Sequence, residues 1–259
     1  MAGAPGQYLM AWERAQFDHA VADLFGYHAL QLGLPNLNAL AMNRMPHRWL
    51  ATQGVQSPVA AEPGAALLTD FAALPFAQAS LDLVVMPHTL DCHADPHATL
   101  REVARVLVPD GRVVISGFNP ASLWGLRFQR ERLSRRWGTG ASLLPPLDKA
   151  IGYGRLRDWL HLLDFDIEVG RFGAYGPVMG SEAWQRRFAW MDRLGARWWP
   201  IFGAAYFLVA VKRVHGVRLL ETKWKTIKQR ANATVPLAHR HTDPTLSHQL
   251  EEEPGFEPR

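Results

Sequence analysis

The sequence has almost no cysteine and no long hydrophobic run. Its one cysteine, Cys92, excludes an intramolecular disulfide and is compatible with a reducing compartment. The apolar, uncharged stretch of residues 198–211 is shorter than the roughly 20 residues that a membrane-spanning helix needs, and Pro200 and Gly203 interrupt it. Residues 1–20 lack the basic start and apolar core of a secretory signal. We therefore expect a soluble, cytoplasmic protein without a transmembrane segment.

The sequence also lacks a strong excess of charge. Lysine and arginine number 28 against 24 aspartates and glutamates, and this net charge of +4 does not by itself indicate a nucleic-acid partner. A hydrophobic fraction of 48% with 20% charged residues is typical of a globular protein. Residues 1–220 are predicted to form one domain. Residues 221–259 are polar, with few candidate core residues, and are predicted to be a loosely ordered tail.

Apolar runs and amphipathic stretches alternate along the predicted domain. Strands are expected at 27–34, 47–52, 66–71, 81–86, 112–118, 165–172 and 204–214. Helices are expected at 9–25, from Asp95-Pro96 to about residue 107, at 155–163 and at 182–195, and a short one is considered at 37–44. This alternation predicts an α/β fold with an open, mostly parallel sheet. Ligands of such sheets bind beyond the carboxyl ends of the strands.

The stretch "LDLVVMPHTLDCHADPH", residues 81–97, runs from an apolar strand into a polar segment at that edge. Its side chains include the metal-ligand types His88, Cys92, His93 and His97. Their spacing matches no familiar zinc pattern, so we expect no metal site. His93 and His97 are expected on the solvated surface and Cys92 in the core. His88 directly follows the strand and is expected to face a pocket.

Residues 69–120 resemble the class I S-adenosylmethionine-dependent methyltransferases, and in particular the generic type that includes quinone-biosynthesis enzymes. The matching features are Asp70 after the third strand, Leu74-Pro75-Phe76, the strand Ser80 to Val84, His88, and the helix and turn from Asp95 to Gly111. The resemblance implies a Rossmann-like three-layer sandwich. Its mostly parallel seven-stranded sheet would have an antiparallel last strand, and S-adenosylmethionine would be the cofactor.

The resemblance also implies roles for individual residues. Asp70 would bind the adenine amino group and Phe71 would flank the ring. Met86, Pro87 and His88 would line the methionine or acceptor side. Asn119 would face the acceptor. Asp91, to which the resemblance assigns no role, is a further candidate acceptor-binding residue.

One part of the sequence departs from the family pattern. The usual Gly-x-Gly-x-Gly loop is reduced to Gly33-Leu34-Pro35-Asn36-Leu37, in which only Gly33 remains. Leu34 and Pro35 add bulk where the backbone normally approaches the cofactor, and Pro35 removes an N–H donor. The acidic residue that usually holds the ribose is not evident, although Gln53 or Glu62 is near the expected place.

Two classes of function follow from these observations. The first is an active methyltransferase acting on a small-molecule acceptor, and the second is a catalytically inactive methyltransferase-like binding or regulatory module. A nicotinamide oxidoreductase is disfavoured because Gly-x-Gly-x-x-Gly is absent after the first strand. Methyl transfer depends mainly on positioning, and a base is needed only when the acceptor loses a proton. His88 is the candidate base, with Asp91 as its orienting partner, although a plain hydrogen-bonding role at the rim is an equal alternative.

The acceptor itself is suggested only by composition. Tryptophans are frequent in the second half of the chain, at positions 124, 137, 184, 190, 198 and 199. They favour an aromatic or lipophilic acceptor, although such residues more often anchor a core. The segment "RFQRERLSRRWG", residues 127–138, leaves open a contact with anionic lipid or RNA, although a solvated helix face is the commoner explanation of such a run.

Overall fold

The computed structural model describes residues 4–53, 65–122, 124–125, 150–176, 195 and 197–213. Its strands are β1 (His28–Leu32), β2 (His47–Thr52), β3 (Ala65–Leu68), β4 (Leu81–Pro87), β5 (Leu107–Phe118), β6 (Phe165–Gly173) and β7 (Ala205–Lys212). Its helices are α1 (Ala4–Ala22), α2 (Thr89–Cys92), α3 (Pro96–Val106), α5 (Tyr153–Leu162) and the 3-10 turn η1 (Pro200–Phe202). The predicted tail and nearly all of the predicted helix 182–195 lie outside the described residues.

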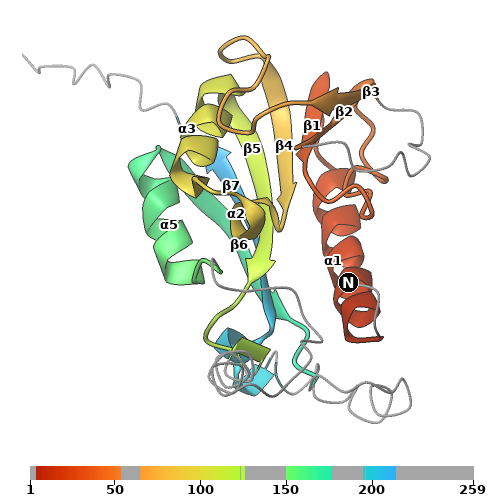
Figure 1. Cartoon of the computed structure of the whole chain (residues 1–259), viewed down its shortest axis with the longest axis vertical. Helices are drawn as coiled ribbons and strands as arrows, with labels where there is room; N and C mark the ends of the chain where they lie inside the picture. The colour runs from red at the N-terminus through yellow and green to blue at the C-terminus, as the bar shows by residue number, and fades with distance from the viewer. Residues whose placement is uncertain are drawn as a thin grey trace, which may run out of the picture. The chain divides into compact units, whose positions relative to one another are not determined.

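The seven strands form one sheet in the order β3-β2-β1-β4-β5-β7-β6 (Figure 1). The neighbouring pairs from β3 to β5 are parallel, whereas β7 runs antiparallel to both β5 and β6. The three-layer α/β fold with an antiparallel last strand is therefore confirmed. Among the described residues, no helix is both long and apolar enough to cross a bilayer.

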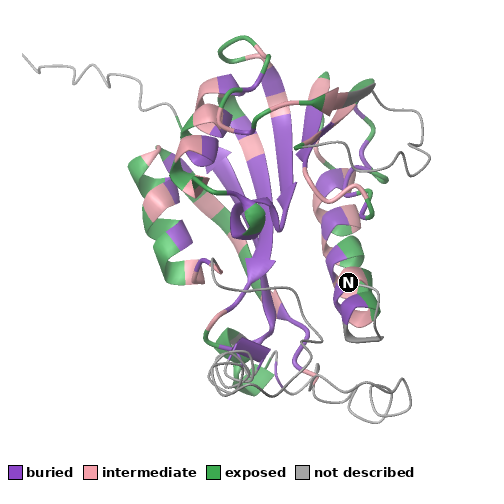
Figure 2. Cartoon of the chain, in the orientation of Figure 1, coloured by how far each residue is buried: buried purple, intermediate pink, exposed green. Residues whose placement is uncertain are grey.

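Helices cover both faces of the central strands, whose residues are almost all buried (Figures 1 and 2). On one face, Phe17 and Val21 of α1 belong to the same buried cluster as Leu83 and Val85 of β4. On the other face, α3 and α5 pack against the alternate strand residues, including Val84 and Met86. Burial on both faces explains why β4 reads as a continuous apolar run.

The helix α3 begins as the sequence predicts. The Asp95 side chain accepts a hydrogen bond from the Ala98 N–H (2.9 Å), and Pro96 occupies the first turn, where its missing N–H costs nothing. At its far end the chain passes directly into β5, and Asp110 adopts a positive φ of 61°. The turn predicted at residues 109–111 is thus a distortion within the strand that the structure assigns from Leu107.

Two charged residues of α3 hold the connection between β3 and β4. The Glu102 carboxylate accepts a hydrogen bond from the Leu74 N–H (2.8 Å), and Arg105 donates to the Phe76 carbonyl (2.8 Å). Arg105 also donates to both oxygens of Glu102 (2.6 and 2.9 Å). Leu74-Pro75-Phe76 and the helix after Asp95, which are separate features in the sequence, are therefore bonded together, and we call this set of contacts the clamp of α3.

The connection from β1 to β2 differs most from the expectation. Residues 33–46 are all described and contain turns but no helix, so the short helix considered at 37–44 is wrong. The buried side chain of Gln31 organises this loop instead. It bonds with four backbone groups, the carbonyls of Gly33, Leu34 and Leu37 and the N–H of Ala39. A loop with so many internal partners does not need a helix to satisfy its backbone.

Candidate functional site

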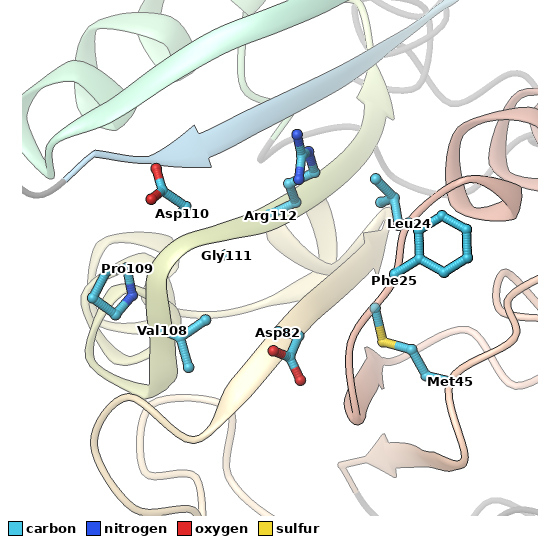
Figure 3. Close-up of a pocket in the computed structure, with 9 residues that line it drawn as sticks. All are labelled: Leu24, Phe25, Met45, Asp82, Val108, Pro109, Asp110, Gly111 and Arg112. Atoms are coloured by element: carbon cyan, nitrogen blue, oxygen red, sulfur yellow. The ribbon is translucent and has the colours of Figure 1, made fainter.

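The carboxyl ends of β1 to β5 meet at one edge of the sheet, because these strands are parallel. Two clusters of polar side chains, one around Asp70 and one around His88, lie at this edge. A small cavity of about 130 Å³ lies at the opposite edge, where the amino end of β4 meets the start of β5 (Figure 3). Its lining residues are Leu24, Phe25, Met45, Asp82 and Val108 to Arg112. None of the residues predicted to form the site lines this cavity.

We call Gln53, Asp70 and His93 the rim cluster. Asp70 follows β3, and its Oδ1 accepts hydrogen bonds from the Ala72 N–H (3.0 Å) and the Gln53 amide (3.2 Å). His93 Nε2 lies 3.5 Å from the same oxygen. The Ala72 N–H, aided by His93 and Gln53, lowers the pKa of Asp70, whose side chain is 64% exposed. Asp70 is thus an ionised, accessible carboxylate, and among the described residues its Oδ2 has no partner.

Phe71 and Thr89 enclose Gly33 at the end of β1. Gly33 has a φ of 74°, which favours glycine, and a Cβ placed there would lie 3.8 Å from the Phe71 ring and 3.5 Å from Thr89 Oγ1. The Gly33 N–H donates to the Ala51 carbonyl (2.8 Å). This N–H is therefore already used within the protein, whereas Phe71 lies over the glycine, where the resemblance expects it to flank a ligand.

We call Glu13, His88 and Asp91 the buried charge cluster. His88 Nε2 lies 2.7 Å from Glu13 Oε1, and His88 Nδ1 lies 3.1 Å from Asp91 Oδ2. All three side chains are at most 5% exposed. Burial opposes a charge on His88, but the carboxylates of Glu13 and Asp91 outweigh it and raise the pKa of His88 to about 10. The ring is therefore a cation at neutral pH.

Three separate elements bring this cluster together. Glu13 is on the buried stripe of α1, four residues from both Leu9 and Phe17. His88 leaves the end of β4 with a positive φ of 51°, and Asp91 lies in α2. Asp91 Oδ2 also accepts a hydrogen bond from the Phe118 N–H (2.9 Å), which fixes it to the end of β5. Sequence reasoning expected Asp91 to orient His88 but missed Glu13, although its position within an apolar stripe was a signal.

Tyr206 of β7 adds a neutral hydroxyl near the cluster. It is fully buried, and burial together with the negative charge of Asp91 raises its pKa well above the usual range. Within the part of the chain that the structure describes, its OH has no hydrogen-bond partner. It faces Gly117 on β5, where a Cβ would collide with the phenol oxygen. Glycine is thus required at this position for Tyr206 to reach its place.

The remaining predicted site residues serve the protein's own packing. Met86 is fully buried in the core cluster on the α3 and α5 face, and Pro87 is the buried last residue of β4. Asn119 follows β5 as predicted, but its amide donates to the carbonyls of Ile201 (2.5 Å) and Gly203 (2.9 Å). Its oxygen accepts from the Ala121 N–H (3.1 Å). In this structure Asn119 joins the end of β5 to the turn before β7.

Two of the expectations about solvent exposure are wrong, those for His93 and Cys92. His93 is buried, because its Nδ1 lies 3.0 Å from Thr99 Oγ1 and beside the backbone of Asp95 at the start of α3. Cys92 is exposed, because the short helix α2 turns it outward. His97 is exposed as predicted, and its ring contacts that of Trp159, with centroids 3.6 Å apart and the planes tilted by 45°. The described residues contain no group of three or more side chains that could hold a metal ion.

Comparisons with known proteins agree with this architecture. Residues 41–115 match the family described as "Methyltransferase domain", a region that begins after the altered glycine loop. The Escherichia coli K12 "Uncharacterized protein YafS" is 35% identical over 171 residues, and the match covers 62% of this chain and 61% of that protein.

Solved structures share the fold at low identity. One is a chain from the complex between the Haloferax volcanii Trm112 methyltransferase activator and a putative methyltransferase. Its TM-score is 0.54 at 19% identity, and the match covers 82% of this chain and 93% of that one. Another is a Thermotoga maritima protein described as a possible histamine N-methyltransferase, with a TM-score of 0.54, 15% identity, and coverage of 80% and 92%. Residues 41–115 thus match a methyltransferase domain, and the sheet as a whole has the fold of these solved structures.

Proposed function

We propose that the chain is an S-adenosylmethionine-dependent methyltransferase that acts on a small-molecule acceptor. The observation that carries the proposal is Asp70, an exposed, ionised carboxylate fixed at the carboxyl end of β3 with Oδ2 unpartnered among the described residues. A carboxylate in this place can accept hydrogen bonds from an adenine amino group.

The residues around Asp70 fit the adenosine end of the cofactor. Gln53 directly follows β2, where the family usually has an acidic residue, and its amide oxygen can accept a hydrogen bond from a ribose hydroxyl. Phe71 and Gly33 would complete the adjoining surface, since the ring lies next to the glycine. Glu62, the other residue considered for the ribose, lies outside the described residues. When bound, the cofactor supplies a methyl group already activated on its sulfonium.

The buried charge cluster changes the role that we propose for His88. A general base must be unprotonated, but the two carboxylates hold the His88 ring as a cation at neutral pH. We therefore propose that His88 is a positioning residue that fixes the end of β4 against α1. The protein's contribution to methyl transfer is then to orient the acceptor and exclude water, which suits an acceptor that needs no base. An aromatic or lipophilic acceptor remains our expectation.

Calorimetric titration with S-adenosylmethionine and S-adenosylhomocysteine tests the proposal. We expect micromolar binding that weakens about tenfold or more in Asp70→Ala, because a hydrogen bond to a charged group is lost. His97→Ala is the matched control, since His97 is an exposed neighbour outside the rim cluster. Equal binding by the wild type and Asp70→Ala would reject the assignment of Asp70.

A specific observation supports a second candidate, a methyltransferase-like module that binds a partner without catalysis. The Gly33 N–H and three loop carbonyls are bonded within the protein, so the methionine end of the cofactor would find fewer free backbone groups. If the folded protein binds neither S-adenosylmethionine nor S-adenosylhomocysteine at millimolar concentration, this candidate replaces the first. Retained circular dichroism and cooperative unfolding in the same sample would exclude misfolding as the cause.

A further inference from the structure

Four large apolar side chains are exposed within five consecutive residues before β7. Trp198 is 69% exposed, Trp199 60%, Ile201 61% and Phe202 48%. We call residues 198–202 the aromatic turn. The other large apolar residues exposed in the described part of the chain lie apart from it in sequence, at Phe25, Tyr27, Met42, Leu68 and Leu162. Single exposed apolar residues are normal, but a group of this size marks an interaction surface.

The backbone of the aromatic turn is held firmly, so its exposed side chains do not belong to a fraying end. The Trp199 N–H donates to the Gly195 carbonyl (2.9 Å), and the Phe202 N–H donates to the Trp199 carbonyl (3.1 Å). The buried amide of Asn119 donates to the carbonyls of Ile201 and Gly203. The Asn119 amide at the end of β5 thus holds both the aromatic turn and the residue that follows it.

The composition of the turn fits the boundary between lipid headgroups and acyl chains. Tryptophan favours that boundary because its ring is apolar and its N–H is polar. Arg197, next to the turn, is exposed, and residues 182–197 of the sequence carry four arginines against two acidic residues, Glu182 and Asp192. Arginine beside apolar residues is the arrangement that binds anionic lipids. A soluble acidic partner would leave the exposed tryptophans unexplained.

We infer that the aromatic turn docks the protein on an anionic lipid bilayer, with Trp198, Trp199, Ile201 and Phe202 inserted at the interface and Arg197 against the headgroups. This docking is peripheral, since it needs only the side chains of a short turn. The inference does not depend on the proposed methyltransferase activity, because neither cofactor nor acceptor takes part in it.

Co-sedimentation of the full-length protein with vesicles tests the inference. We expect binding to vesicles of equal parts phosphatidylglycerol and phosphatidylcholine, weaker binding to pure phosphatidylcholine, and a decrease with added salt. Trp198→Ser with Trp199→Ser should lower the partition coefficient about tenfold or more, because two interfacial anchors are lost. Phe25→Ser with Tyr27→Ser is the matched control, since it removes two equally exposed rings elsewhere and should leave binding unchanged.

A second readout follows insertion directly. Vesicles with brominated acyl chains should quench the tryptophan fluorescence of the wild type, and they should quench it less in Trp198→Phe with Trp199→Phe, which keeps an apolar turn and therefore keeps binding. Absence of binding to both kinds of vesicle, or equal binding by the wild type and the serine variant, overturns the inference. So does a dimer in sedimentation equilibrium that the serine variant dissociates, because the turn would then be an interface between two copies.

Discussion

Two pairs of a histidine and an aspartate lie at the same edge of the sheet, and they differ in their access to water. At the rim, His93 lies 3.5 Å from an Asp70 side chain that is 64% exposed. In the buried charge cluster, His88 lies 3.1 Å from an Asp91 side chain that is 5% exposed, and Glu13 is 2.7 Å away on its other side. The pair at the rim thus presents a solvent-accessible carboxylate, whereas the pair in the buried charge cluster holds a histidine cation out of contact with solvent.

The comparison shows that a residue distant in sequence decides the chemistry of a local motif. Both pairs lie within or next to the stretch that resembles the methyltransferases, but only His88 receives a second carboxylate, from α1. An exposed ion pair contributes little to stability, whereas removing one member of a buried group leaves an uncompensated charge. The following predictions test this difference, from the largest expected change in stability to the smallest.

Removing His88 should have the largest effect. His88→Ala leaves the carboxylates of Glu13 and Asp91 buried without their shared cation, which should lower the free energy of unfolding by about 3–5 kcal/mol. Urea denaturation at pH 7 measures the change, and His19→Ala, an exposed change on α1, should leave the midpoint nearly unchanged. A His88→Ala protein as stable as the wild type would mean that the cluster does not hold its charges in the folded state.

The stability of the wild type should decrease as the pH rises. The pKa of His88 is raised in the folded protein, so its stabilising effect is complete below the usual value of 6.5 and is lost as the pH approaches the folded value of about 10. Between these values we expect a loss of about 1.4 kcal/mol per pH unit relative to His88→Gln. Urea denaturation of both proteins from pH 7 to pH 9.5 gives this difference, and parallel curves would contradict it.

Breaking the clamp of α3 should lower the free energy of unfolding by less than the removal of His88. Glu102→Ala removes the acceptor of the Leu74 N–H and the partner of Arg105, which should cost about 1–2 kcal/mol. Part of the Arg105 side chain is exposed, so the lower end of this range is expected. Arg101→Ala, an exposed change on the same helix, is the control in thermal unfolding. Equal melting temperatures for the two variants would show that the clamp does not stabilise the connection from β3 to β4.

Changing the rim should have the smallest effect on stability. Asp70→Ala removes an accessible carboxylate and the acceptor of the Ala72 N–H, so its urea midpoint should fall less than that of Glu102→Ala even though cofactor binding weakens. The difference in urea midpoint between Asp70→Ala and His88→Ala is the most direct test of the difference between the two histidine–aspartate pairs. A large destabilisation by Asp70→Ala would indicate that Asp70 supports the fold and would weaken its assignment to a ligand.

Much of the fold could be predicted because the sequence features that indicate it are local. The apolar run of β4, the cap of Asp95 and the position of Asp70 after β3 depend on neighbouring residues, and the structure has all three. The burial of His93 could not be predicted, because it depends on Thr99 and on the path of the chain through α2. The second partner of His88, Glu13, was missed although its place on an apolar stripe was a signal, because the contact forms only when α1 packs on the sheet.

The contact between Glu13 and His88 has a consequence for how the chain folds. In the unfolded chain His88 has an ordinary pKa near 6.5 and is mostly neutral at pH 8, whereas in the folded protein it is a cation. Folding at pH 8 therefore takes up about one proton from the solvent. The heat of refolding should then vary with the ionisation enthalpy of the buffer, and in His88→Gln that variation should disappear.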